Sequence, residues 1–316
     1  MKESEDDMRN KKQNLIKPKT STGELNMSAI KLNHDVRQLL KKIRFPQIGR
    51  PYALFDLETT DRDVDLAKIA SIAAVKVNAY GSLEVFYEYI CPDHPMTTGA
   101  TDVNRLTDSF LQQHGRPSKE VLNEFKAFIE DLPLIAHNGQ SFDGPILATH
   151  LRDYCGFKGI SLTNPLIDTM QLAMAHAGKK APKGFKLQKL MQEIDPTYVQ
   201  THDALDDVIA MAAVYERLAR KTPSFEEQFE QTGSYTLASN FVLPADVERQ
   251  WPQLAEALNR GMTLDLDYKG KEKPESRRDI SPFRVVSPRT MRAYCHQRNE
   301  IVNFNFDGIK KIHKVK

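Results

Sequence analysis

The chain has 316 residues, of which 40% are hydrophobic and 27% are charged. This balance excludes collagen-like, low-complexity and disordered chains, whose compositions differ strongly from that of a globular domain. No segment reaches the roughly 18 consecutive apolar residues that cross a bilayer, and the charged N-terminus is followed by no signal-peptide core. The three cysteines have neither a metal-binding nor a disulfide spacing, which favours buried or unreactive thiols. We therefore expect a cytoplasmic protein without a membrane partner.

The net charge of +2 conceals an uneven distribution along the chain. Residues 1–48 carry a net charge of +5 and residues 259–316 carry +7, whereas residues 49–258 carry −10. An acidic centre between basic ends suits a metal-dependent enzyme of nucleic acids, because carboxylates hold cations and basic side chains attract phosphate. Ordinary solvated surface would explain the same distribution, so charge alone does not decide the function.

Residues 1–48 are predicted to form a basic tail and a short helix. The first 26 residues are polar and lack periodicity, and Met27 is an alternative start. A loose apolar stripe predicts a helix over residues 28–44. Two prolines, Pro46 and Pro51, then interrupt the chain before the main domain.

Residues 49–222 are predicted to form one α/β domain with a mixed central sheet flanked by helices. Strands are expected at Tyr52–Leu57, Ile69–Ala79, Leu83–Cys91 and Pro133–Ala136, with a hairpin turn at residues 80–82. Helices are expected at Thr107–His114, Ser118–Asp131, Asp143–Tyr154, Asp168–Ala177, Leu187–Glu193 and Asp203–Arg220. Three consecutive strands, followed by helices with one further strand among them, indicate an α+β or a mixed α/β domain with a central sheet.

The rest of the chain is predicted to be a helical linker and a small β-rich domain. The linker comprises residues 223–258, with helices expected at Phe225–Phe229 and Ala245–Leu258. In residues 259–316, strands are expected at Thr263–Tyr268, Phe283–Val286, Met291–His296 and Val302–Phe306.

The segment ALFDLETT joins an apolar strand to two carboxylates, Asp56 and Glu58. Residues i and i+2 of a strand point to the same face, so these two anions lie side by side. Such anions repel each other unless a cation lies between them. A strand that ends in a polar loop would give the same letters, and this pair alone does not decide between the two.

Two later segments carry further candidates. Asp143 lies where a loop passes into a helix, and helix capping alone would explain it. Asp203 is explained as the residue that caps the start of the next helix. Asp206 is explained as an acid that is favourable near the positive end of that helix. Asp207 instead lies in the apolar row of that helix, an unusual place for a carboxylate. His202 can approach Asp207 only if it belongs to the preceding loop, because five residues of one helix turn through about 140°.

Taken together and in this order, the three segments resemble the motifs of the DEDDh family of 3′→5′ exonucleases, which are RNase H-like and include proofreading subunits and ribonuclease T. The matching stretches are FDLETT, HNGQSFD and HDALDD, within roughly residues 50–220. Asp168 and the pair Leu187 and Leu190 also stand where the family has similar residues. One departure is Val103–Thr107, where many relatives carry a His-Gly pair. It concerns contacts with the substrate strand and not the metal site.

The resemblance implies a role for each matched position. Asp56, Glu58, Asp143 and Asp207 would hold two Mg²⁺ or Mn²⁺ ions, hard cations that prefer oxygen ligands. His202 would be the general base, since a histidine pKa near neutrality suits proton transfer. Three further residues would contact the terminal nucleotide: Leu57, Thr59 and Phe142. A purely structural role in the core is an equally good explanation for them.

Residues 262–312 resemble a WYL domain, a small β-barrel-like module. The features that match include Tyr268, Arg277 and Arg278, the segment Ala293–Cys295, and the two aromatic residues Phe304 and Phe306. Family members often carry ligand-surface arginines where this chain has Val302, Asn303 and Gly308. The basic side chains of the module, including Arg277, Arg278 and Arg292, are candidates for contact with a phosphate backbone. A solvated barrel surface is the alternative.

The sequence therefore predicts a metal-dependent 3′→5′ exonuclease that hydrolyses phosphodiester bonds at the 3′ end of single-stranded nucleic acid. DNA is favoured slightly over RNA as the substrate. The alternative is a nucleic-acid-binding regulator with an inert nuclease domain, and the complete set of acids argues against it. A small-molecule phosphodiesterase lacks a motif of its own. A homodimer and a polymerase or repair partner both stay open.

Overall fold

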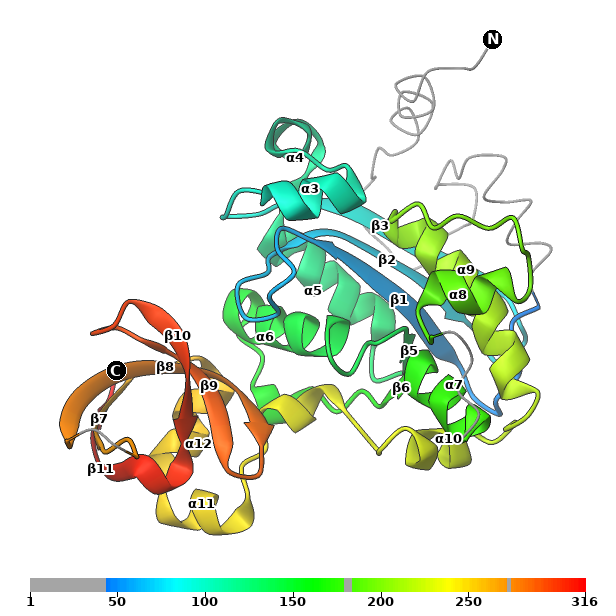
Figure 1. Cartoon of the computed structure of the whole chain (residues 1–316). Helices are drawn as coiled ribbons and strands as arrows, with labels where there is room; N and C mark the ends of the chain where they lie inside the picture. The colour runs from blue at the N-terminus through cyan, green and yellow to red at the C-terminus, as the bar shows by residue number, and fades with distance from the viewer. Residues whose placement is uncertain (1–43, 179–183, 272–273) are drawn as a thin grey trace.

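The computed structural model describes residues 44–178, 184–271 and 274–316. The helix expected at residues 28–44 lies outside this part of the chain, except for its last residue. Within the described part, the strands form a six-stranded sheet and a five-stranded sheet (Figure 1). None of the helices there has both the length and the apolar character that crossing a membrane requires.

The six-stranded sheet has the order β4-β3-β2-β1-β5-β6 and is mixed. Its strands are β1 (Tyr52–Thr59), β2 (Ile69–Val77), β3 (Leu83–Cys91), β4 (Arg116–Pro117), β5 (Leu134–Ala136) and β6 (Leu166–Asp168). Strand β1 is antiparallel to β2 and parallel to β5, and β6 continues the parallel part. The carboxyl ends of β1, β5 and β6 therefore meet at one edge of the sheet.

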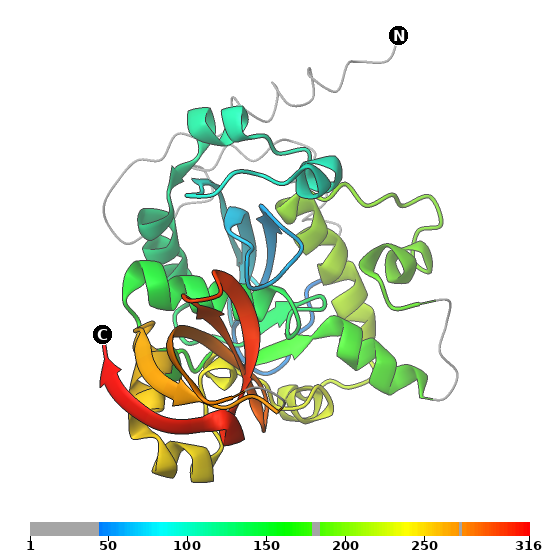
Figure 2. The ribbon, with the colours of Figure 1, turned by 60° about the vertical axis from the view of Figure 1, so that its left-hand side comes forward.

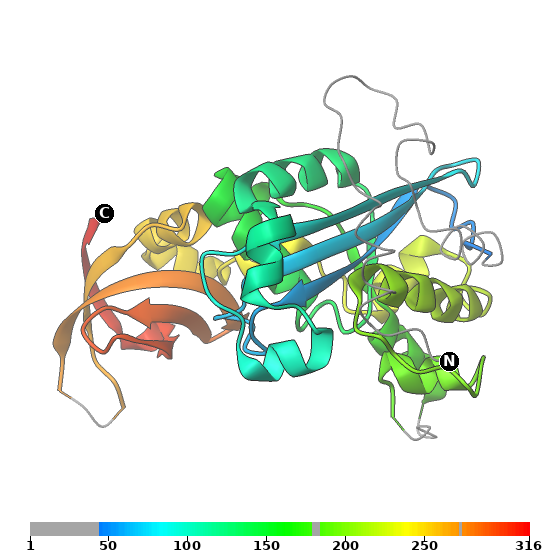
Figure 3. The same cartoon turned by 90° about the horizontal axis from the view of Figure 1, so that it is seen from above.

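Helices cover both faces of this sheet. They are α3 (Thr98–Asn104), α4 (Asp108–His114), α5 (Ser118–Ile129), α6 (Asp143–Cys155), α7 (Thr169–Ala177), α8 (Leu187–Gln192), α9 (Ala204–Ala219) and α10 (Phe225–Gln231). Side chains of β1 alternate between the faces. Tyr52 and Leu54 pack with α9, whereas Phe55 packs with α5 and α6. Figure 3 shows the sheet between these two helical layers.

The C-terminal part is an antiparallel sheet preceded by two short helices. Its elements are α11 (Ala245–Gln250), α12 (Pro252–Arg260), β7 (Leu264–Tyr268), β8 (Ser276–Ser287), β9 (Thr290–Cys295), β10 (Glu300–Asn305) and β11 (Ile309–Val315). The strand order is β10-β9-β8-β7-β11. Figure 2, where these strands are orange to red, shows the sheet strongly curved. Single turns of 3₁₀ helix lie at Gly159–Ser161, Leu237–Asn240 and Phe306–Gly308.

One apolar core extends from the first sheet into the second. A single cluster of buried side chains includes Phe55 on β1, Phe241 and Leu258 in the connecting region, and Ile280 and Met291 in the C-terminal sheet. The sequence predicted two folded units with a helical linker, and the interior of the protein is continuous between them.

Most expected elements of residues 49–222 are present, and so is the turn at residues 80–82, where Gly81 has a φ of 80°. The sequence did not predict α3, β4, β6 or β11. Strand β11 was missed because its exposed lysines break the alternation of a half-buried strand. The single helix expected at residues 245–258 is two helices, because Trp251 leaves the helical conformation and Pro252 starts the next helix.

Candidate active site

Asp56 and Glu58 lie near the carboxyl end of β1, at the middle of the sheet. Because they are two residues apart, both point to the sheet face that α9 covers. They line a cavity of about 300 Å³ at the sheet edge where β1 and β5 end. The expected side-by-side arrangement of the two carboxylates is therefore present.

Asp143 enters the same cavity from the first turn of α6. Its Oδ1 accepts a hydrogen bond of 3.3 Å from the backbone N–H of Leu57, which ties the second segment to the first. The residue that caps α6 is Phe142, which makes no capping hydrogen bond through its side chain. Helix capping, the alternative explanation for this aspartate, is therefore not its role.

The loop before Asp143 is held in place by Asp168, at the end of β6. The Asp168 carboxylate accepts backbone hydrogen bonds from Asn138 at 2.9 Å and Gln140 at 3.2 Å, and it also caps α7 through Met170. Asn138 has a φ of 60°, which turns the chain sharply at the start of the loop. The parallel pairing of β5 with β6 thus fixes where α6 and its aspartate begin.

Asp207 completes the group from the first turn of α9 and is 3% exposed. His202 lies in the preceding loop with a φ of 54°, and its Nδ1 is 4.0 Å from Oδ2 of Asp207. This is the arrangement that the spacing of the two residues requires. Asp203 caps α9 by accepting hydrogen bonds from Leu205 and Asp206, so its capping role is confirmed.

The four carboxylates are crowded, and Glu58, Asp143 and Asp207 are buried, whereas Asp56 is half-buried. Burial is the main cause that raises the pKa of Asp56 and of Glu58 well above the ordinary range, and repulsion from the other acids adds to it. Burial likewise raises the pKa of Asp143 and of Asp207 to about 7 in each case. Such a cluster is costly without a cation to neutralise it.

The residues fit a divalent cation. Ligand atoms of Glu58, His202 and Asp207 all lie within 4.8 Å of one another. Among the described residues, Oδ1 of Asp207 is a buried oxygen that has no hydrogen-bond donor. Oxygen-rich, anionic sites of this kind select hard cations.

The contribution of Asp143 and Asp207 to the stability of the metal-free protein should fall as the pH rises from about 4 to about 7. Their pKa values rise from an ordinary 3.8 to about 7 in the folded state. The unfolded chain therefore loses these protons first, and the folded state loses its relative advantage as the pH approaches 7. Urea denaturation in EDTA across this range measures the effect.

The matched control is the double variant Asp143→Asn and Asp207→Asn, which should lack this part of the pH dependence. Mg²⁺ should restore the stability of the wild type at pH 7 and leave the variant unchanged. Identical pH profiles for the two proteins in EDTA would contradict the assigned shifts.

Among the cavity residues that were not predicted as functional, three act on the site residues. Gln200 donates a 2.6 Å hydrogen bond from Nε2 to Oδ2 of Asp207. Asn104, at the end of α3, hydrogen-bonds the carbonyl of Thr59 and lowers the pKa of Glu58 against the effect of burial. Arg62 also lines the cavity, and its charge adds to burial in lowering the pKa of His202. Only folding brings these side chains to the acids, although Arg62 stands close to Glu58 in sequence.

The predicted nucleotide contacts fall into two groups. Leu57, Thr59 and Phe142 all line the cavity with the four acids. The three candidate arginines of the C-terminal domain do not line it. Arg277 makes a bidentate ion pair with Asp265, and Arg292 donates from Nε to Asp65 at 2.6 Å.

This chain belongs to the exonuclease family, whose sequence model matches residues 54–215. Enzymes of this family depend on divalent metal ions. A second model, that of the WYL domain, matches residues 250–314, and the C-terminal unit is a WYL domain. The mixed sheet with its helices is the RNase H-like exonuclease fold, as predicted.

Among curated proteins, the DNA polymerase III PolC-type of Halalkalibacterium halodurans is 34% identical over 179 residues, which are 55% of this chain and 12% of that protein. The PolC-type polymerase of Streptococcus mutans is 34% identical over 122 residues, 39% of this chain and 8% of that protein. This chain thus spans about a tenth of the length of these relatives.

Two solved structures of Escherichia coli exonuclease I share the fold. The zinc-bound complex with single-stranded DNA has a TM-score of 0.51 at 14% identity, over 78% of this chain and 54% of that chain. The complex with a dT13 oligonucleotide has a TM-score of 0.50 at 14% identity, over 78% and 55% respectively.

Proposed function

We propose that this protein is a DEDDh-type 3′→5′ exonuclease that hydrolyses the terminal phosphodiester bond of single-stranded nucleic acid. The observation that carries the proposal is the convergence of four carboxylates from three separate segments beside one histidine. Similarity to PolC-type polymerases, and to exonuclease I bound to single-stranded DNA, supports nucleic acid as the substrate. DNA is favoured over RNA because the solved relatives contain DNA.

Asp56, Glu58, Asp143 and Asp207 would hold the cations, for which we propose two Mg²⁺ or Mn²⁺ ions. When bound, such ions neutralise charge on the scissile phosphate and lower the pKa of the attacking water. The protein contributes a preformed anionic pocket. Helices α6 and α9 both begin beside it, and their first turns bring Asp143 and Asp207 into it. The main-chain bond from Leu57 to Asp143 keeps two of the ligand-bearing segments in register.

His202 is positioned to accept the proton of the attacking water. Burial lowers its pKa below the ordinary value, which favours the neutral imidazole that can accept a proton. Its Nδ1 lies 4.0 Å from Asp207, a carboxylate that stabilises the imidazolium formed on proton transfer. Gln200 donates its hydrogen bond to Oδ2 of Asp207, the same oxygen that faces the histidine, and so holds this oxygen in place.

Phe142 and Leu57 line the cavity with apolar groups, although Leu57 is 4% exposed and also belongs to the apolar core. Thr59 lines it as well, and its hydroxyl donates to the carbonyl of Asp61. Apolar and aromatic walls suit the face of a nucleobase, and stacking of this kind tolerates any base. The cavity volume of about 300 Å³ is at the lower end of the range for ligand sites, which suits one terminal nucleotide of a frayed or single strand.

A degradation assay tests the proposal. Single-stranded DNA and RNA of one sequence, labelled at the 5′ end, are incubated with Mg²⁺, Mn²⁺ or EDTA. We expect a metal-dependent ladder that shortens from the 3′ end, and His202→Ala should slow it by about 10²- to 10⁴-fold. The His202 variant should still gain thermal stability from Mg²⁺, because the four acids are intact.

Full-rate cleavage by His202→Ala would remove the histidine from the mechanism. Binding of the strand without cleavage under any metal would favour the alternative of a nucleic-acid-binding regulator with an inert nuclease domain. Faster degradation of the RNA strand would reverse the substrate preference proposed above.

A further inference from the structure

The segment between β1 and β2, residues 60–68, runs from the carboxylate cavity to the WYL domain. It begins one residue after Thr59, and Asp61 and Arg62 line the cavity. Asp65, in the second half of the segment, contacts two strands of the WYL domain. We call residues 60–68 the bridging loop, because one short stretch of chain touches both units.

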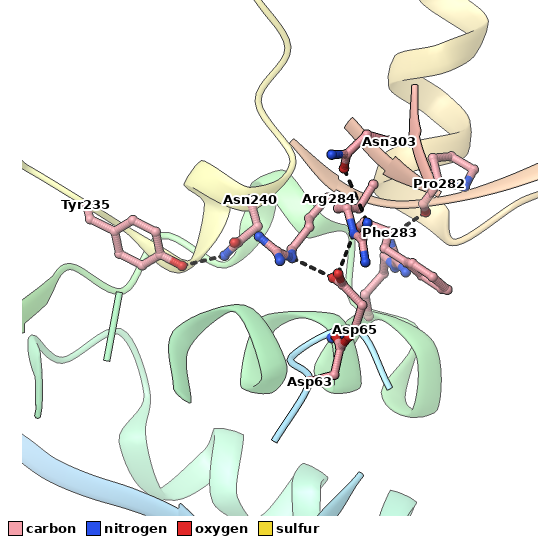
Figure 4. Close-up of polar contacts among 10 residues, drawn as sticks. Asp63, Asp65, Tyr235, Asn240, Pro282, Phe283, Arg284 and Asn303 are labelled. Atoms are coloured by element: carbon pink, nitrogen blue, oxygen red, sulfur yellow. Dashed lines mark hydrogen bonds and ion pairs between the residues drawn. The ribbon is translucent and has the colours of Figure 1, made fainter. Parts of the chain in front are cut away.

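Asp65 is enclosed by two arginines of the WYL domain. Its Oδ1 accepts a hydrogen bond from Nε of Arg284 at 2.8 Å, and its Oδ2 accepts one from Nε of Arg292 at 2.6 Å. Figure 4 shows the Asp65 carboxylate directed toward Arg284. The aspartate side chain is 4% exposed, and those of the arginines are 20% and 23% exposed. Ion pairs shielded to this degree are screened far less by salt than surface pairs.

The two arginines depend on this anion. Arg284 on β8 and Arg292 on β9 are cross-strand partners in the sheet, so their charges lie side by side. Like charges in this position destabilise a sheet unless an anion separates them. Asp65 supplies the anion, and the WYL sheet and the bridging loop therefore hold each other in place.

Hydrogen bonds within the bridging loop make its backbone rigid, so the position of Asp65 determines the position of the residues at the cavity. Oδ1 of Asp61 accepts from the backbone N–H of Asp63 at 2.8 Å, and Oδ1 of Asp63 accepts from that of Asp65 at 2.9 Å. The ends are closed by two hydrogen bonds between Thr60 and Lys68, of 2.9 Å and 3.0 Å. Successive side-chain turns of this kind fix the backbone between the cavity and Asp65.

The rigid backbone of the bridging loop fixes the position of Arg62. Of the described residues that line the carboxylate cavity, it alone is a lysine or arginine. Its Nη2 donates to the carbonyl of Gly99 at 3.2 Å, and it makes no ion pair among the described residues. An exposed guanidinium at the edge of an acidic pocket is suited to a phosphate, which it binds with paired N–H groups.

We propose that Arg62 binds a backbone phosphate of the substrate strand, and that Asp65 is the positioning residue through which the WYL domain holds Arg62 in place. This inference rests on the proposed function, since the phosphate belongs to the strand that the acids would cleave. A cavity of about 490 Å³, lined by residues of both units including Asp65, Lys68 and Tyr294, lies beside the loop. It gives the loop space to shift once Asp65 is released.

The first experiment measures binding of a fluorescent single-stranded oligonucleotide by anisotropy, with Mg²⁺, in the slow His202→Ala background. Arg62→Gln should weaken binding about tenfold, the effect of one charge-assisted contact, whereas Arg62→Lys should retain most of it. Asp65→Asn should weaken binding by a factor of about three to ten, within the range of coupled contacts. The double variant Arg62→Gln and Asp65→Asn should bind no more weakly than Arg62→Gln alone.

The control is Arg298→Gln, which removes an exposed WYL-domain ion pair with Glu300 and leaves the bridging loop untouched. It should bind as the parent does. If Asp65→Asn causes the same loss with and without Arg62, the two act independently and the proposed coupling is wrong. If Arg62→Gln binds normally, the assigned phosphate contact is wrong.

Amide hydrogen exchange of the full chain, measured without substrate, tests whether the WYL domain holds the bridging loop in place through Asp65. The amides of Asp63, Asp65 and Lys68 should exchange faster in Asp65→Asn than in the wild type or in Arg298→Gln. Unchanged protection in Asp65→Asn would show that the WYL domain does not hold the loop. If the wild type neither binds nor cleaves a single strand, the proposed function and the role of Arg62 fail together, while exchange still decides whether Asp65 holds the loop.

Discussion

Replacing Asp207 by asparagine should abolish cleavage and make the metal-free protein more stable. The rate should fall by about three orders of magnitude or more, because cations in such sites contribute several kcal/mol to transition-state stabilisation. Stability in EDTA should rise, because burial and the neighbouring acids raise the pKa of Asp207 to about 7 and its charge is unfavourable above that pH. The 5′-label assay and thermal melting in EDTA at a pH above 7 measure the two effects.

Asp206→Asn is the matched control, since Asp206 is the preceding residue of α9 and does not line the cavity. It should keep near-normal activity and should gain less stability in EDTA than Asp207→Asn, because Asp206 is only one of the charges that act on Asp207. Normal turnover by a folded Asp207→Asn protein would overturn the assigned metal site. Equal loss of activity in both variants would point instead to damage at the start of α9.

Replacing Arg152 by methionine should lower the free energy of unfolding by about 3 kcal/mol or more, because buried acceptors lose a charged donor. The Arg152 side chain is 2% exposed and lies near the end of α6. Its Nη1 donates to the carbonyls of Leu258 at 2.8 Å and Phe283 at 3.0 Å, and its Nε donates to Asp153. Methionine fills much of the volume and restores none of these hydrogen bonds. Urea denaturation measures the loss.

Arg217→Met is the control for this prediction. Arg217 on α9 is 51% exposed and pairs with Glu193 at 3.2 Å, so its loss should change stability by less than about 1 kcal/mol. Equal midpoints for the two variants would contradict the anchoring role of Arg152. A large loss in Arg152→Met alone would show that the WYL domain contributes to the stability of the whole chain.

The sequence predicted the parts of the site that are carried by local patterns. The strand that bears Asp56 and Glu58 was visible because its neighbours are apolar and the acids lie at its end. The helix that bears Asp207 was visible through its apolar periodicity, and the position of His202 in the preceding loop followed from the angle that a helix turns per residue. These positions depend on residues that are adjacent in the chain.

Contacts between distant segments were not predictable. Asp65 is separated from Arg284 by 219 residues and from Arg292 by 227, and no local pattern joins them. The sequence offered Arg292 as a phosphate contact because it is one of several basic residues. The structure places it against Asp65, where its charge is already paired. Gln200 is only seven residues from Asp207, and it was overlooked because it lies in an irregular loop, where no periodic pattern predicts the direction of a side chain.

The continuous core has a consequence for how such a protein can change in evolution. Phe55, Phe241, Ile280 and Met291 belong to one buried cluster that crosses from the first sheet to the second. The WYL domain cannot simply be replaced by another domain, because its inner face forms part of the core of the first domain. A replacement would have to match the packing of that surface. A substitution in one domain at this shared surface should therefore require a compensating substitution in the other.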